Sequence, residues 1–389
     1  RVSDGMNLQP NHIYLITPGK NMTIFQGKLF LTEQDTSRAM NMPIDIFMRS
    51  LAQDQGKNAV GIILSGTGSD GTLGIRAIKE HSGMVMSQDD RSAKFDGMPR
   101  STISTGMVDY ILTPGEMPEA LVNYIKHPFI QKTVKIENQI SQDEDYLSKI
   151  IMIIREATGI DFSNYKESTI IRRLEKRISI NRYDKIEDYV TFITDNKREV
   201  NILFKELLIG VTRFFRDVEA FSRLEEKVIL ELLKGGKRKE PLRIWCVGCS
   251  TGEEAYTLAM LIKERMDELD VNPEVKLFAT DIDKDSIEFA GVGLYPESIV
   301  SDVSAERLSR FFTRKEEGYQ VSEEIRNMVV FAAHNILRDP PFSKMDLISC
   351  RNMLIYLNNQ VQQRILSMFY FSLRKESYLF LGSSESVGN

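Results

Sequence analysis

Apolar and polar residues follow two different periods along this chain, and together they predict mixed α/β structure. Short apolar runs of strand length occur at Ala59–Leu64, Leu242–Val247, Val275–Asp281, Met328–Ala333 and Met345–Cys350. Helical spacing of apolar residues is found at 44–55, at 147–158, at 168–178 and onward to Leu208. Since runs and helical stretches alternate in the last third, an open parallel α/β sheet is the predicted fold there.

The first third predicts a smaller α/β region. His12–Thr17 has the pattern of a strand that ends at Pro18-Gly19, and Thr23–Leu31 that of a hairpin around Gly27. Ala59–Leu64 is followed by the small-residue stretch Ser65–Gly74 and then by another helix. Ligands bind beyond the carboxyl ends of such strands, so this stretch is a candidate site.

Residues 242–260 predict a strand, a tight turn and a helix. We expect Gly248 and Gly252 to leave room for a ligand beside the turn, because neither has a β-carbon. Glu253 begins the helix, where a second anion would be repelled and an amine or hydroxyl groups would be favoured. The stretch has neither the lysine of a phosphate loop nor the G-x-G-x-x-G pattern.

A second strand, Val275–Asp281, ends in an acid at the place where doubly wound folds hold a ribose. Together with Glu253, Asp281 predicts a site for a nucleoside that carries no phosphate charge.

Length and charge narrow the class of protein. The 389 residues suit two or three domains, and the formal charge of −5 has its signs interspersed, so a nucleic acid is not the expected partner. No apolar run approaches the length of a membrane span and the first residues do not resemble a secretory signal, so we expect a cytoplasmic protein without membrane insertion. The first residue is Arg, which suggests a piece of a longer protein.

Cysteine use is sparse, with Cys246, Cys249 and Cys350 the three present. Cys246 and Cys249 have the spacing of half a zinc site or a redox pair, but no second Cys/His pair with ligand spacing accompanies them. Packing as small apolar groups is the favoured interpretation, and no metal is predicted.

Two motifs in the first third, Gly66-Thr-Gly-Ser-Asp-Gly71 and Phe95-Asp-Gly-Met-Pro-Arg100, resemble the catalytic domain of chemotaxis receptor methylesterases of the CheB type. The resemblance implies a Ser-His-Asp triad of which only Asp70 has a counterpart here. The nucleophile and the catalytic histidine are expected upstream of residue 1, so this chain alone should not hydrolyse esters. Asp70 is then either the orienting acid of that triad or a helix cap in a relic domain.

Two stretches of the middle region contain basic residues whose role the sequence leaves open between two alternatives. The helix at 168–178 has four basic residues apart from its apolar stripe, and these form either a solvated face or a dock for an acidic helix: Arg172, Arg173, Lys176 and Arg177. In the turn after Leu208, Arg216 is either a packing residue or a fixed cation beside a ligand carboxylate.

Five further motifs in order resemble the chemotaxis receptor methyltransferases of the CheR type over residues 145–389. They are Thr212-Arg-Phe-Phe-Arg216, Cys249-Ser-Thr-Gly-Glu-Glu254, Ala279-Thr-Asp-Ile-Asp283, His334-Asn-Ile-Leu337 and Cys350-Arg-Asn-Met-Leu-Ile-Tyr356. The resemblance implies that S-adenosylmethionine is bound by Thr212, Arg216, Glu253, Asp281, Asn335, Ile336, Arg351 and Asn352. It also implies that Arg216 and Tyr356 lie nearest the transferred methyl. Gly210 and Ala255 depart from the family's usual residues.

The resemblances imply an amino-terminally truncated CheB/CheR fusion of α/β class. We expect a partial methylesterase domain at 1–126, a linker at 127–145, a small all-α domain at 146–221 and a Rossmann-like, doubly wound methyltransferase domain at 222–389. The implied activity is methyl esterification of glutamates in the cytoplasmic helical region of chemoreceptors or similar signalling proteins. Alternatives are a methyltransferase for another substrate and a catalytically silent signalling scaffold.

Overall fold

The computed structural model describes residues 1–34, 40–131, 144–208, 210–234 and 240–387. These residues form two compact units. Unit 1 comprises Arg1–Ser163, Glu167–Val211 and Pro296–Ser301, and unit 2 comprises Asn164–Lys166, Thr212–Tyr295 and Asp302–Asn389. Among the helices that the structure describes, none combines the length and the apolar character needed to cross a membrane.

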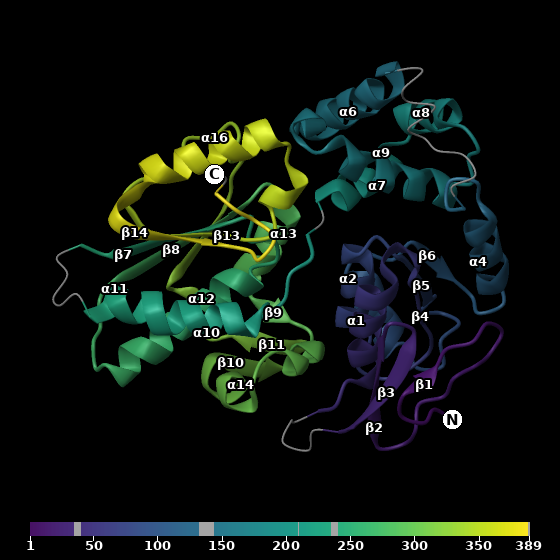
Figure 1. The fold of residues 1–389 in the computed structure, drawn as a ribbon, viewed down its shortest axis with the longest axis horizontal. Helices are drawn as coiled ribbons and strands as arrows, with labels where there is room; N and C mark the ends of the chain where they lie inside the picture. Colours follow the sequence, from purple (N-terminus) through teal and green to yellow (C-terminus); the bar gives the residue numbers. More distant parts are fainter. Residues whose placement is uncertain (35–39, 132–143, 209, 235–239, 388–389) are drawn as a thin grey trace. The chain divides into compact units, whose positions relative to one another are not determined.

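Unit 1 begins with two three-stranded sheets, one antiparallel in the order β1-β3-β2 and one parallel in the order β4-β5-β6 (Figure 1). Its elements here are β1 (Met6–Asn7), β2 (Lys20–Phe25), β3 (Lys28–Glu33), α1 (Pro43–Gln55), η1 (Gly56–Asn58), β4 (Val60–Ile63), α2 (Thr72–Glu80), β5 (Met84–Gln88), α3 (Gly97–Ser104), β6 (Tyr110–Leu112) and α4 (Met117–Lys126).

The predicted hairpin around Gly27 is confirmed, since β2 and β3 pair on either side of it. The predicted strand at His12–Thr17 is wrong. Ile13 and Leu15 are 91% and 61% exposed, and the segment pairs with no strand among the described residues. An apolar alternation without a neighbouring strand cannot satisfy its backbone in a ladder.

Helices make up the rest of unit 1. They are α6 (Glu144–Thr158), η2 (Phe162–Asn164), α7 (Glu167–Ile180), α8 (Ile186–Asp195) and α9 (Lys197–Leu208), with η4 (Glu297–Ser301) contributed from later in the chain. Ile150, Ile154 and Leu203 are fully buried, so the apolar stripes seen in the sequence form the helical core.

Unit 2 is built on a parallel sheet in the order β12-β8-β7-β13-β14. Its main elements are α10 (Val218–Leu224), η3 (Glu225–Ile229), α11 (Leu230–Lys234), β7 (Leu242–Val247), α12 (Glu253–Glu268), β8 (Val275–Asp281), α13 (Lys284–Val292), β12 (Val329–Ala333), β13 (Met345–Cys350), η5 (Leu354–Tyr356), α16 (Asn359–Ser372) and β14 (Leu373–Leu381). A small excursion holds β9 (Leu294–Tyr295), α14 (Ala305–Phe311), β10 (Phe312–Lys315), β11 (Gly318–Val321) and α15 (Glu323–Arg326).

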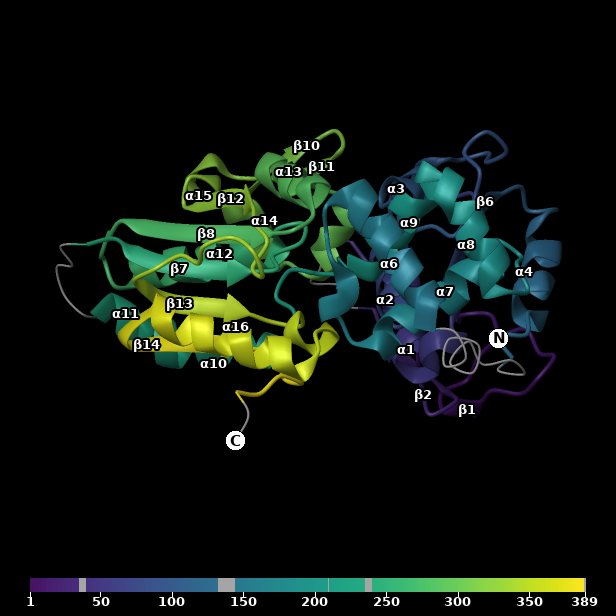
Figure 2. The ribbon, with the colours of Figure 1, turned by 90° about the horizontal axis from the view of Figure 1, so that it is seen from above.

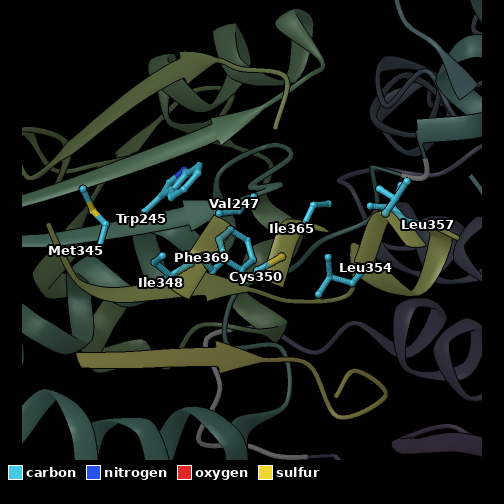
Figure 3. Close-up of a cluster of buried hydrophobic side chains, with 10 residues drawn as sticks. Trp245, Val247, Met345, Ile348, Cys350, Leu354, Leu357, Ile365 and Phe369 are labelled. Carbon is cyan, nitrogen blue, oxygen red and sulfur yellow. The ribbon is translucent and has the colours of Figure 1, made fainter. Parts of the chain in front are cut away.

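Helices α12 and α16 cover opposite faces of this sheet (Figures 1 and 2). All six residues of β13 are buried, as expected for a parallel strand covered on both sides. On the α16 face, Trp245, Ile348 and Phe369 belong to one apolar cluster, drawn in Figure 3. The α/β, doubly wound prediction for this region is confirmed.

The strand order reverses between β7 and β13. From β7 the chain proceeds outward to β8 and β12, and it then returns to β13 and β14 on the other side. At such a switch point the connections diverge and leave a crevice at the carboxyl ends of the strands. The motif residues that follow β7, β8 and β13 therefore share one edge of the sheet.

Candidate functional site

The turn between β7 and α12 is held in left-handed backbone conformations. Gly248, Ser250 and Gly252 have φ values of 67°, 48° and 92°. A β-carbon on Gly252 would lie 2.8 Å from the Ala290 β-carbon and 3.1 Å from the Phe331 ring. Packing against the protein therefore accounts for this glycine. The expectation that it makes room for a ligand is wrong.

Asp281 ties this turn to the end of β8. Its carboxylate accepts hydrogen bonds from the backbone N–H of Ser250 at 2.8 Å and of Asp283 at 2.9 Å. Burial raises the pKa of Asp281, while the backbone donors act in the opposite direction. Each carboxylate oxygen has two lone pairs, so both oxygens retain capacity to accept from a ligand.

Two adjacent acids open α12. The Glu253 carboxylate, which is buried, accepts from the Thr251 hydroxyl at 2.6 Å. The Glu254 carboxylate accepts from the Ser349 hydroxyl at 2.6 Å and lies 3.7 Å from the Arg351 guanidinium. Burial raises the pKa of Glu254, and the Arg351 charge opposes that shift. The role of Glu254 was not predictable from the sequence, because its partner Ser349 lies on a strand 95 residues away.

The three cysteines are buried, which confirms packing as their role. The Cys246 thiol donates to the Glu254 carboxylate at 3.7 Å. Burial raises the pKa of all three thiols well above the ordinary value. Thiolate chemistry at neutral pH is therefore not expected of them.

Arg216 lies in a backbone-strained loop. Its neighbours Phe215 and Asp217 both have positive φ, 50° and 62°, which is unusual for residues other than glycine. The Phe215 N–H donates to the Thr257 hydroxyl at 3.1 Å. Strain of this kind persists only where the surroundings enforce it, and it gathers at functional sites.

Arg351 holds the strained loop around Arg216 in place. Its guanidinium donates to the Arg216 carbonyl at 3.3 Å and to the Asp217 carboxylate at 2.6 Å. The Phe221 and Phe380 ring centroids are each 4.8 Å from it. The structure therefore gives Arg351 contacts that hold the Arg216 loop, a role that the sequence did not suggest. We call this set of contacts the arginine clamp.

The other predicted residues lie on segments that end at the same sheet edge. The Asn335 side chain accepts from the Leu337 N–H at 3.0 Å, and the Asp281 carbonyl accepts from the His334 N–H at 2.8 Å, which ties this segment to β8. Ile336 packs against the core of unit 2. Asn352 has a φ of 59°, and its N–H donates to the Glu385 carboxylate at 2.9 Å. Thr212 is half-buried ahead of the Arg216 loop.

Tyr356 stands at the end of η5, and its carbonyl accepts from the Lys166 N–H at 2.8 Å. The adjoining Tyr165 pairs with Leu357 through an isolated bridge. Burial raises the pKa of Tyr165, and the charge of Asp281 adds to that shift. Tyr165 is thus a residue near the site that the sequence does not indicate, since it lies outside every motif.

Asp70, the predicted remnant of an esterase triad, caps a helix in unit 1. Its carboxylate accepts from the backbone N–H of Ile44 at 3.1 Å and of Asp45 at 2.9 Å, at the start of α1. Burial raises its pKa, and these donors oppose the shift. The helix it caps is α1, which precedes it by about 25 residues, rather than the helix that follows it.

The predicted exposed basic face on α7 is wrong for three of its four cations. Arg172 is exposed, but Arg173, Lys176 and Arg177 are 2%, 3% and 5% exposed. Arg177 forms a two-pronged pair with Glu199 at 2.8 and 2.7 Å. The helical pattern identified a polar stripe, and that stripe faces carboxylates elsewhere in unit 1 rather than solvent.

Three family models match successive parts of the chain. They are CheB methylesterase over residues 1–121, the all-alpha domain of CheR methyltransferase over 145–208, and the SAM binding domain of CheR methyltransferase over 210–389.

Individual proteins show the same likeness. The chain is 38% identical over 406 residues to an uncharacterized 104.1 kDa protein of Rhodobacter capsulatus; this covers 99% of the chain but only 42% of that longer relative. It is 32% identical over 260 residues to the chemotaxis protein methyltransferase of Borreliella burgdorferi, covering 65% of the chain and 92% of that protein. Among solved structures, the CheB methylesterase catalytic domain of Thermotoga maritima is 28% identical, with a TM-score of 0.28 over 31% of the chain and 66% of that domain.

Proposed function

The chain belongs to the CheR family of chemotaxis methyltransferases, preceded by a CheB methylesterase segment, and from that premise we propose that it methylates glutamate side chains of a chemoreceptor-like signalling protein. S-adenosylmethionine is the methyl donor of the matched domain. The observation that carries the proposal is the pair of carboxylates, half-buried Asp281 and buried Glu253, on either side of the turn at the switch point.

The residues present fit this donor. A nucleoside with hydroxyls, an ammonium group and no phosphate suits carboxylates whose described partners are N–H and hydroxyl groups. We assign Asp281 to the ribose hydroxyls and Glu253 to the amino group or sugar. Asn335, Ile336, Asn352 and Thr212 complete the proposed lining, with Arg351 acting through the clamp.

The donor supplies a methyl group on a sulfonium, which is already a good leaving group. The acceptor carboxylate is ionised at neutral pH, so alignment rather than a strong base limits the reaction. Arg216 is the proposed cation for a carboxylate, and the strained loop fixes its backbone before substrate arrives. Tyr356 is the proposed orienting hydroxyl next to the transferred methyl.

Ester hydrolysis is not part of the proposed function of these residues. Asp70 accepts hydrogen bonds from two backbone amides, and a carboxylate without a nucleophile and a base leaves the acyl-transfer barrier almost unchanged.

The test is to incubate the protein with methyl-labelled S-adenosylmethionine and receptor-rich membranes. Methyl esters of glutamate release labelled methanol in mild base, so base-labile label on receptor is the expected result. Base-stable label would assign the enzyme to another acceptor, and binding of the donor without any transfer would identify a silent scaffold. Either outcome would contradict the proposal.

A further inference from the structure

Unit 1 contains five charged side chains buried together, which we call the charged seam. Lys79 and Asp109 come from the methylesterase segment, taken as residues 1–126, whereas Arg173, Lys176 and Glu206 come from the helical segment that holds α6 to α9, residues 144–208. Their side chains are 7%, 1%, 2%, 3% and 8% exposed. Charged residues are almost never buried to this degree unless they are paired.

Two pairs of the seam cross between the two segments, Lys79 with Glu206 and Lys176 with Asp109, whereas Lys79 with Asp109 and Arg173 with Glu206 pair within one segment. Lys79 bonds to Asp109 at 2.7 Å and also to Glu206. Lys176 lies 3.2 Å from Asp109, and Arg173 lies 3.6 Å from Glu206. Each segment therefore supplies a counter-charge that the other needs.

Backbone carbonyls of the methylesterase segment also accept hydrogen bonds from the α7 cations. Arg173 donates to the Lys79 carbonyl at 3.2 Å, and Lys176 donates to the Gly83 carbonyl at 2.7 Å. The Lys79 carbonyl lies in the last turn of α2, where C=O groups make a helix end partly negative, whereas Gly83 lies in the turn between α2 and β5. Arg173 thus meets the electronegative end of a helix, and Lys176 meets a carbonyl of the turn that follows it.

Apolar contacts continue the same surface. Ile180, at the end of α7, packs with Met84, Met86 and Tyr124 of the methylesterase segment. The Tyr110 hydroxyl donates to the Ile180 carbonyl at 3.0 Å. One face of α7, charged along most of its length and apolar at its end, is therefore covered by residues 79–124.

We infer that the methylesterase segment serves as a resident ligand of α7 and closes its basic face to other acidic partners. Without the methylesterase segment, Arg173 and Lys176 would keep Glu206 as their seam carboxylate and lose Asp109, so an uncovered α7 would carry an excess of positive charge there and attract an anionic helix or strand. The alignment with the Borreliella burgdorferi methyltransferase spans 65% of this chain and 92% of that relative. The relative is therefore too short to contain a methylesterase segment as well as the two methyltransferase segments. The cover is thus an addition in chains that carry the methylesterase segment.

Brief acetylation of lysines followed by mass spectrometry tests whether the face is closed. In the wild-type chain, Lys79 and Lys176 should label at least about tenfold more slowly than the exposed Lys185, because buried amines are shielded from reagent. Equal labelling of Lys176 and Lys185 would overturn the inference. The acetylation experiment uses the wild-type chain alone, so its result does not depend on whether a variant folds.

Peptide binding tests what the cover excludes. The probe is a fluorescent, Glu-rich helical peptide, measured by anisotropy at low salt without S-adenosylmethionine, so the result is independent of methyl transfer. Asp109→Lys should expel α7 from the seam and bind the peptide at least about tenfold more tightly than wild type. Asp195→Lys makes the same charge change at an exposed position and is the matched control. Equal affinities for wild type and Asp109→Lys, or an Asp195→Lys affinity equal to that of Asp109→Lys, would overturn the inference.

Discussion

The charged seam of unit 1 and the site at the carboxyl ends of the unit 2 strands, which contains Asp281 and Glu253 and which we call the strand-end site, both hold carboxylates, but they compensate the negative charges differently. Burial alone would raise the pKa of Glu206, yet the charges of Lys176, Lys79 and Arg173 outweigh it and hold that pKa well below the ordinary value. Asp281 is held by backbone N–H groups, and its pKa is raised. One carboxylate is neutralised by side-chain cations, the other by neutral dipoles.

This difference separates structural charges from functional ones. A buried carboxylate already matched by cations gains little from a ligand, and removing it leaves those cations unpaired. A carboxylate held by dipoles, as Asp281 is, keeps its charge available to hydroxyl or ammonium groups of a ligand, and shifted pKa values gather at such sites. We therefore expect variants of the seam to affect stability and variants of the strand-end site to affect binding.

The largest effect is expected from Glu206→Ala. It leaves Lys79, Lys176 and Arg173 with Asp109 as their remaining seam carboxylate, and breaking a buried pair in this way costs about 3–5 kcal/mol. Urea unfolding followed by circular dichroism measures the loss, with the exposed Glu187→Ala as control. Equal unfolding free energies for the two variants would show that the seam is not a structural element.

Arg351→Lys should break the arginine clamp with little loss of fold. A lysine cannot bond to the Arg216 carbonyl and the Asp217 carboxylate in the same planar fork, so the strained loop should relax. Misplacement of Arg216 by about 1 Å should lower kcat about 100-fold.

The matched control for the clamp is Arg374→Lys, since Arg374 also bonds to a carboxylate and a backbone carbonyl, Glu240 and Lys344. Initial rates at saturating S-adenosylmethionine compare the two variants. A kcat for Arg351→Lys equal to that of the control would show that Arg351 does not position Arg216 for catalysis.

The seam should also give unit 1 a dependence on pH. Burial lowers the pKa of Lys176 to about 7 in the folded protein, well below the value of about 10.4 for an unfolded lysine. The unfolded chain therefore binds more protons between these values, so stability should rise with pH from 7 to 10 by at most about 1.4 kcal/mol per pH unit. The pKa of Lys79 is raised, so that residue adds no slope in this window.

Urea unfolding at pH 7, 8 and 9 measures this dependence in wild type and in Lys176→Met. The variant should show a flatter profile, because the titrating amine is gone. Parallel profiles for the two proteins would assign the dependence to other groups.

The smallest effect is expected from Asp70→Ala. The carboxylate caps α1, so its loss should lower stability by about 1 kcal/mol. Methyl transfer should be unchanged. Methanol release from methylated receptor by wild type that disappears in Asp70→Ala would instead reveal an overlooked nucleophile.

Patterns within a few residues of one another were readable from the sequence. The strands at 242–247, 275–281 and 345–350 were predicted because buried parallel strands are continuous apolar runs, and Asp281 follows from its place at the end of one.

Contacts between distant residues were not readable. Periodicity marks Arg173 and Lys176 as polar positions of α7, but nothing near them in sequence indicates that Asp109 and Glu206 will cover them. The clamp joins Arg351 to Asp217 across 134 positions for the same reason. The functions of charged residues therefore depended on partners that only the fold brings together.

The most direct test of the contrast between the two regions is calorimetric titration with S-adenosylmethionine of wild type, Asp281→Ala and Lys176→Met. Asp281→Ala should weaken binding by at least about 1.5 kcal/mol, more than tenfold, because ligand hydroxyls lose a charged acceptor. Lys176→Met should bind as wild type does, since the seam lies outside the strand-end site. Unchanged affinity in Asp281→Ala, or an equal loss in Lys176→Met, would contradict the assignment of binding to the carboxylates at the switch point.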